Sequence, residues 1–115
     1  MDQVCFALPV LAGKTEDAHT FFRELEGERK SAFVASEQRI NVTKESWHLQ
    51  QTPQGGLLLA YTESPDFANA LKSFSRSQEE FDEWFKQRLA EVTGVDLNHP
   101  PPGALSEQLS SYQSA

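Results

Sequence analysis

The fold is decided by residues 45–62, which read ESWHLQQTPQGGLLLAYT. In the first part of this stretch, Trp47 and Leu49 alternate with polar residues, which is the two-residue period of a β-strand. Residues 52–56 (TPQGG) have the residue types of a tight turn, and an apolar, β-favouring run follows them to Thr62. The stretch is therefore expected to form a β-hairpin.

The position of the turn determines which hairpin side chains share a face. A tight turn at Gln54-Gly55 pairs His48 with Tyr61, and paired residues point to the same side of a sheet. A three-residue loop would shift the pairing and undo this assignment. The first face then carries Ser46, His48, Gln50, Leu59 and Tyr61, and the second carries Trp47, Leu49, Leu58 and Ala60.

The segments around the hairpin carry signals of further elements. Residues 3–11 alternate as a strand does, and a helical pattern begins near Thr15. Gly27 weakens that pattern, so one long bent helix and two shorter helices up to about residue 39 are both open. Residues 64–66 (SPD) are typical of a helix start. A second helix is expected to begin at the capping box of Ser77 and Glu80 and to end at Gly94.

After residue 95 the sequence permits two interpretations. The run Pro100–Pro102 has few backbone donors and must be extended. Residues 105–112 (LSEQLSSY) could be a polar tail, but the apolar side chains of Leu105, Leu109 and Tyr112 would then have no core to pack against. We therefore expect a closing strand there, because one more strand would complete a sheet.

The resulting order, βαββα(α)β, is that of the ferredoxin-like split βαβ fold. We expect residues 1–115 to form one α+β domain: a four-stranded antiparallel sheet with helices on one face. The other face would carry side chains that are too apolar to be left in water: Leu11, Leu57, Leu59 and Tyr61. Two sheets packed face to face would cover them, so a homodimer, a dimeric α/β barrel, is expected.

Three blocks of the sequence, in this order, resemble a family of small uncharacterised proteins in the dimeric α/β-barrel (ferredoxin-like) superfamily. They are residues 46–55 (SWHLQQTPQG), residues 81–85 (FDEWF), and Pro100–Pro102 followed by residues 106–109 (SEQL). The resemblance covers nearly the whole chain and implies the barrel fold. It implies no particular activity, because the superfamily includes cofactor-free monooxygenases, haem-degrading proteins and muconolactone-isomerase-like enzymes. The haem-degrading members' Asn/Trp/His constellation has no counterpart here, so no catalytic residue is transferred from them.

The composition argues against several classes of partner. The formal net charge is −7, from 17 acidic and 10 basic residues, and the longest basic run is Arg29-Lys30. Nucleic-acid and anionic-membrane binding both need clustered basic residues, so neither is expected. The single cysteine, Cys5, fits a reducing compartment, and Asp2 and Gln3 replace the basic start of a secretory signal. A cytoplasmic protein is the default expectation.

The candidate chemistry is centred on His48 and Tyr61. A histidine acts as a general acid or base near neutral pH, and Tyr61 would orient it or donate to an oxyanion. Ser46, Gln50 and Leu59 share their face and would line a ligand cavity, and Arg39 could reach an anionic group at its mouth. The plainer interpretation places His48 and Gln50 on a half-wet strand near the sheet edge and makes Arg39 a helix cap.

No metal or cofactor is expected, since the three histidines lack metal-ligand spacing and no phosphate-binding glycine loop is present. Two functions from different classes remain. The first is a homodimer that binds a small apolar ligand, or a cofactor-independent monooxygenase- or isomerase-like enzyme that uses His48 and Tyr61. The second is a non-catalytic accessory protein whose sheet face packs against the second protomer of the dimer. Empty volume behind the sheet separates the two.

Overall fold

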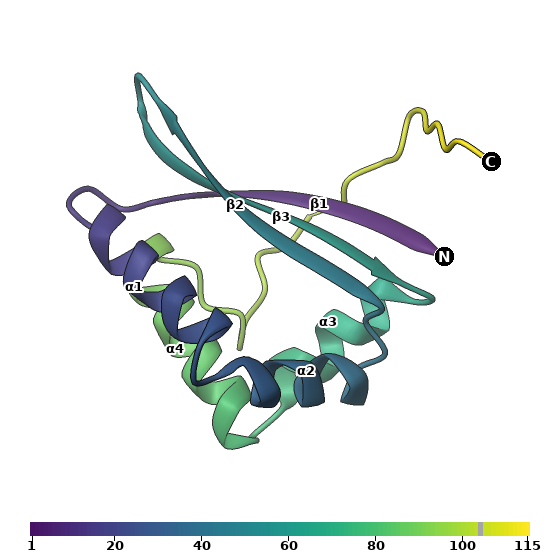
Figure 1. Cartoon of the computed structure of the whole chain (residues 1–115), viewed down its shortest axis with the longest axis horizontal. Coiled ribbons are helices and arrows are strands. Elements are labelled where there is room, and N and C mark those ends of the chain that lie inside the picture. The colour runs from purple at the N-terminus through teal and green to yellow at the C-terminus, as the bar shows by residue number, and fades with distance from the viewer. Residues whose placement is uncertain (104) are drawn as a thin grey trace.

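The computed structural model describes residues 1–103 and 105–115, which form a three-stranded sheet and four helices (Figure 1). The elements follow one another as βααββαα. In chain order they are β1 (Asp2–Pro9), α1 (Thr15–Glu26), α2 (Lys30–Arg39), β2 (Lys44–Thr52), β3 (Gly55–Ser64), α3 (Phe67–Arg76) and α4 (Glu80–Thr93). Of the two possibilities for residues 15–39, the structure has two helices, separated at Gly27.

The sheet is antiparallel with the strand order β1-β3-β2, so β3 is its central strand. All four helices lie on one side of it (Figure 1). Residues of β3 are alternately buried and half-buried along its length, with Leu58, Ala60 and Thr62 buried toward the helices. The opposite side, here called the open face, has no helix over it among the described residues.

The hairpin forms as expected, but its turn lies one residue earlier in the chain. Thr52 pairs with Gly55, so the turn is Pro53-Gln54, and His48 pairs with Leu59 instead of Tyr61. The Thr52 hydroxyl donates to the Gly55 carbonyl at 2.8 Å and accepts the Gln54 N–H, and Gly55 has φ +122°, which favours glycine. The pairing of His48 with Tyr61 is therefore wrong by two residues. An even shift exchanges no side chain between faces, so the assignment of residues to faces is confirmed.

The expected closing strand is wrong, and with it the four-stranded ferredoxin-like order. The described residues 105–115 form no strand. They lie beside β1 and contact it with their side chains. The Cys5 N–H donates to Ser106 Oγ at 2.9 Å, and Gln108 Nε2 donates to Gln3 Oε1 at 3.1 Å. A strand ladder needs regular backbone pairing, and a hydroxyl that takes the place of a carbonyl interrupts it. The chain is therefore an α+β fold, but not βαββα(α)β.

The core lies between the helix-facing side of the sheet and the helices. Its centre is a cluster of aromatic rings, with Phe85 in contact with Phe21, Phe33, Phe74 and Trp47 at centroid distances of 5.2–6.5 Å. Each fully buried ring of this kind stabilises the fold by about 1.5–3 kcal/mol. This packing leaves a space between the sheet and residues of α2, α3 and α4.

The structure differs from the expected starts of α3 and α4 and agrees with the expected end of α4. The expected start at residues 64–66 is shifted, because α3 begins at Phe67 and its cap is Asp66, which accepts the Asn69 N–H. Gly94 ends α4 in the left-handed region at φ 76°, as expected. The capping box is wrong, because α4 begins at Glu80 and the Ser77 hydroxyl donates to the buried carboxylate of Asp82. Ser77 thus contacts the start of α4 through Asp82 and the Glu79 N–H, and not through the expected capping box.

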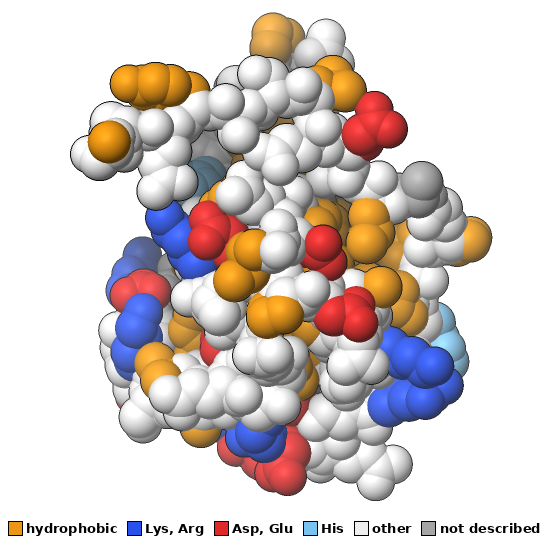
Figure 2. All heavy atoms as spheres, turned by 90° about the vertical axis from the view of Figure 1, so that its right-hand side faces the viewer, with side chains coloured by type: hydrophobic (Ala, Val, Ile, Leu, Met, Phe, Trp, Pro, Cys, Tyr) orange, Lys and Arg blue, Asp and Glu red, His pale blue; other side chains and the backbone are white. Residues whose placement is uncertain are grey.

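Charged residues are spread over the surface of the molecule. On the side shown in Figure 2, hydrophobic side chains reach the surface between acidic ones, and Lys and Arg side chains stand in separate groups. No helix among the described residues is long and apolar enough to cross a membrane.

Candidate functional site

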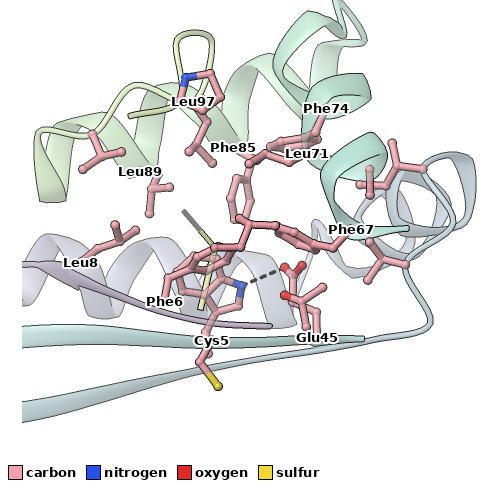
Figure 3. A pocket seen from close by; sticks show the side chains of 18 of the residues that line it. Cys5, Phe6, Leu8, Glu45, Phe67, Leu71, Phe74, Phe85, Leu89 and Leu97 are labelled. Carbon is pink, nitrogen blue, oxygen red and sulfur yellow. Dashed lines mark hydrogen bonds between the residues drawn. The ribbon is translucent and has the colours of Figure 1, made fainter. Parts of the chain in front are cut away.

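A cavity of about 480 Å³, here called the sheet–helix cavity, lies between the sheet and helices α2, α3 and α4. Its volume falls within the range of about 300–1,000 Å³ that is common for small-molecule sites. Figure 3 shows its apolar side chains converging from both layers of the fold. Among those labelled there are Phe6, Phe67, Leu71, Phe74, Phe85 and Leu89.

The chain that follows α4 forms one wall of this cavity. Leu97 and the run Pro100–Pro102 contribute side chains, and Leu105 and Ser106 continue the wall toward β1. The hydrogen bond from the Cys5 N–H to Ser106 holds this segment against the strand. The segment that was expected to complete the sheet therefore covers a cavity instead.

Two carboxyl groups, Glu37 on α2 and Glu45 on β2, interrupt the apolar lining. Glu45 points into the cavity, and its Oε2 accepts the indole N–H of Trp47 at 2.8 Å (Figure 3). Oε2 of Glu37 is fully buried, and no conventional donor reaches it from the described residues. Its polar neighbour is the second carboxyl group, so the two acids compete for protons.

Burial, followed by the negative charge of Glu45, raises the pKa of Glu37 to about 9. Burial also raises the pKa of Glu45, although hydrogen bonds with Trp47 and Glu37 act in the opposite direction. Glu37 is therefore protonated at neutral pH and able to share its proton with Glu45. Such a pair can donate a hydrogen bond, accept one, or exchange a proton with a bound molecule.

An ion pair between exposed Arg39 and buried Asp82 lies close to the carboxyl pair. Asp82 on α4 is fully buried and accepts hydrogen bonds from the hydroxyls of Ser36 and Ser77. It also lies 3.1 Å from Arg39 Nη2, at the end of α2. The guanidinium of Arg39 thus binds a protein carboxylate and joins two helices, and its contact with an anionic ligand stays a prediction.

The other residues expected at the site lie elsewhere. Strand alternation places Ser46, His48, Gln50, Leu59 and Tyr61 on the open face, outside the sheet–helix cavity. Ser46 and His48 also border a second groove of about 400 Å³ between α1 and the free edge of β2.

His48 and Tyr61 have different hydrogen-bond partners. His48 Nε2 lies 3.1 Å from Ser46 Oγ, while Tyr61 donates to Glu63 Oε2 at 2.6 Å. The hydrogen bond to Glu63 raises the pKa of Tyr61 to about 12, which makes ionisation of the phenol harder. The structure thus puts the two residues on one face without joining them, and their catalytic role stays a prediction.

Sequence reasoning missed both carboxyl groups of the cavity, although each left a signal. Glu45 shares the two-residue period of Trp47 and Leu49, so it is a charge on the helix-facing side of a strand. Glu37 follows buried Phe33 by one helical turn, which places an acid on the core side of α2. An ionisable residue in phase with a buried stripe is unusual, because burying a charge is costly.

Comparison with protein-family models gives no match, and comparisons with curated proteins and with solved structures give none either. What the structure shows is a small α+β fold with a three-stranded antiparallel sheet and four helices. Function must therefore be argued from the cavity itself.

Proposed function

We propose that this protein binds a small, mostly apolar molecule in the sheet–helix cavity, with the Glu37–Glu45 pair as its polar contact. The observation that carries the proposal is an apolar space of about 480 Å³ whose wall includes two carboxyl groups, those of Glu37 and Glu45. A cavity lined mostly by aromatic and aliphatic side chains, with a few convergent polar groups, has the composition of a ligand site.

Two energetic terms favour an occupant. Each 100 Å² of apolar ligand surface removed from water contributes about 2.5 kcal/mol. A ligand donor that reaches the Glu37–Glu45 pair adds a hydrogen bond to a charged group, which is worth about 1.5–3 kcal/mol. The first term gives affinity for any molecule that fits, and the second orients it.

Binding can be tested with N-phenylnaphthylamine, a neutral dye whose fluorescence increases in apolar surroundings. We expect saturable binding of one dye per chain. Leu71 is half-buried on the cavity wall, so Leu71→Trp should fill part of the space and weaken dye binding about tenfold or more. The matched control is Leu59→Trp, which enlarges a half-buried leucine on the open face. Equal affinity in the wild type and Leu71→Trp would contradict the proposal.

We also propose that a second copy of the chain covers the open face. Leu57, Leu59 and Tyr61 remain half-exposed there. On the C-terminal segment, Leu109 and Tyr112 keep 87% and 90% of their surface exposed. The end of the chain passes β1 and lies on the side away from the helices in Figure 1. One partner could therefore bury both apolar groups, and a symmetric pair would bury each of them twice.

Light scattering at micromolar concentration tests this arrangement. The expected mass is twice the 12.9 kDa of one chain. Leu59→Glu should give the single-chain mass, because a charge at the centre of an apolar interface is costly to bury. Gln50→Glu, which adds the same charge at an exposed position of the edge strand, is the control. A single-chain mass for the wild type would reject the dimer and leave the ligand proposal intact.

A further inference from the structure

The sheet–helix cavity carries an unusual charge balance for an apolar space. From α2 and β2, Glu37 and Glu45 face into it, and Asp82 lies close behind on α4. Cys5 of β1 also borders it, but its sulfur points away from the cavity (Figure 3). The described wall residues of β3, α3 and the segment after α4 have no titratable side chain, and no wall residue among those described is Lys, Arg or His.

The nearby positive charge of Arg39 is already paired with another carboxylate. Arg39 is 3.1 Å from Asp82, so its guanidinium balances that carboxylate and not the pair in the cavity. Among the described contacts, the negative charge of Glu45 is stabilised by two neutral donors, the Trp47 N–H and the carboxyl group of Glu37, and by no cation. A cationic group inside the cavity would therefore meet uncompensated negative charge in a medium where Coulomb interactions are strong.

The walls around the pair are aromatic. The ring centroids of Trp47 and Phe85 are 5.9 Å apart, and Phe33 stacks on Phe85 at 6.5 Å with an interplanar angle of 8°. Phe6 and Phe67 approach each other at 5.4 Å on another part of the wall. Aromatic faces attract cations through the negative potential of the ring, and they do so best where water is excluded.

We propose that the ligand of the sheet–helix cavity is an organic cation, a protonated or quaternary amine on an apolar body, whose nitrogen lies between the Glu37–Glu45 pair and the aromatic wall. This inference rests on the proposed function, since it names the class of molecule that the cavity takes. An anion of the same shape is disfavoured by the two carboxyl groups. A bare divalent metal ion is also a poor fit, because Ca²⁺ and Mg²⁺ need about six to eight oxygen ligands. The described residues contain no group of three or more side chains able to hold a metal.

The pair also couples binding to protons. Free Glu37 is protonated at neutral pH, since its pKa is about 9, and an ammonium group favours the ionised form. Binding of the cation should therefore release protons, and its affinity should increase as the pH rises toward that pKa. A neutral ligand of equal size gains nothing from ionisation of the pair, so its affinity should not rise in the same range.

Three ligands of equal length provide the test: phenylbutylamine, phenylbutanol and phenylbutanoate, which are cationic, neutral and anionic near neutral pH. Each is titrated into the wild-type protein loaded with N-phenylnaphthylamine. We expect the amine to displace the dye about tenfold more effectively than the alcohol, and the acid to be weakest. Calorimetry of the amine in phosphate and in Tris should give different heats, because the released proton is taken up by the buffer.

The variant Glu37→Gln/Glu45→Gln keeps the size of both side chains and removes their charge. It should still bind the dye, but the amine should lose its advantage over the alcohol. Glu63→Gln, on the open face, is the control and should retain the advantage. If the double variant does not fold, the three-ligand comparison and the two-buffer calorimetry on the wild type decide alone.

The outcomes separate the two proposals. If the dye binds but the alcohol or the acid displaces it as well as the amine does, the organic-cation proposal is overturned while the cavity remains a ligand site. If the dye and all three ligands fail to bind, the proposed function itself is rejected.

Discussion

Trp47 donates its indole N–H to the carboxylate of Glu45, two residues earlier on β2, at 2.8 Å. Both side chains lie on the helix-facing side of the strand because strand residues two apart share a face. The bond holds a carboxylate beside an aromatic ring inside an otherwise apolar cavity. This local relationship supplies half of the proposed site, and Glu37 on α2 supplies the other half.

The carboxyl pair should make stability depend on pH. The pKa of Glu37 is raised from 4.5 to about 9 in the folded protein, so the folded state binds more protons than the unfolded state between these values. Stability is then fully present below about pH 4.5 and decreases as the pH rises toward 9, by at most about 1.4 kcal/mol per pH unit for this group. Urea unfolding at several pH values should show a flatter profile for Glu37→Gln and an unchanged one for Glu63→Gln. A wild type that gains stability over this range would contradict the assignment.

The ion pair between Arg39 and Asp82 should matter more than exposed ion pairs. Arg39→Met leaves a buried carboxylate without its cation, and we expect a loss of about 1–3 kcal/mol in the free energy of unfolding. Lys30→Met breaks the exposed pair with Glu26 and should change stability by less than about 0.5 kcal/mol. Denaturant titration of both variants measures the difference; equal effects would show that Asp82 does not depend on the guanidinium.

Lys86 should stabilise the end of α3. Its buried ammonium donates to the carbonyl groups of Phe74, Ser75 and Ser77 at 2.9–3.2 Å. These carbonyls close α3 and the turn to α4, so Lys86→Met should cost about 1–3 kcal/mol. Hydrogen exchange should accelerate at the end of α3. Lys72→Met, at an exposed position on the same helix, is the control, and a similar loss in that variant would rule out the capping role.

His48 and Tyr61 should not take part in ligand binding within the cavity. Both lie on the open face, so His48→Ala and Tyr61→Phe are expected to keep dye affinity within about twofold of the wild type. Fluorescence titration measures this directly. A loss of dye affinity of about tenfold or more in either variant would place the binding site on the open face, as the sequence alone predicted.

The C-terminal segment should retain the ligand. Leu105 and Ser106 form part of the cavity wall, and the Cys5 N–H bond holds them in place. Deletion of residues 105–115 should therefore accelerate dye release, measured by stopped-flow fluorescence, with little change in the helical circular-dichroism signal. Ser106→Ala, which removes only the hydrogen bond, should have a smaller effect of the same sign. Unchanged release from the truncated chain would show that the segment is no barrier.

The sequence by itself determined the hairpin and the distribution of its side chains over two faces. Both depend on local properties: the alternation of Trp47 and Leu49 with polar residues, and turn chemistry between two β-favouring runs. The predicted partner of His48 was wrong by two residues, but the prediction of which side chains share a face was still correct, because a shift of two residues keeps the two-residue period of a strand. The end of α4 at Gly94 was local in the same way.

Only the tertiary structure decided where the cavity lies and which residues enter it. Glu37 of α2 and Glu45 of the edge strand β2 meet on the wall of one cavity, and no spacing in the sequence records that contact. Likewise, residues 105–112 could have closed the sheet, but a bond from the Cys5 N–H to a serine hydroxyl replaces the strand ladder. Periodicity states which way a side chain points, whereas the space it points into depends on how the helices stand over the sheet.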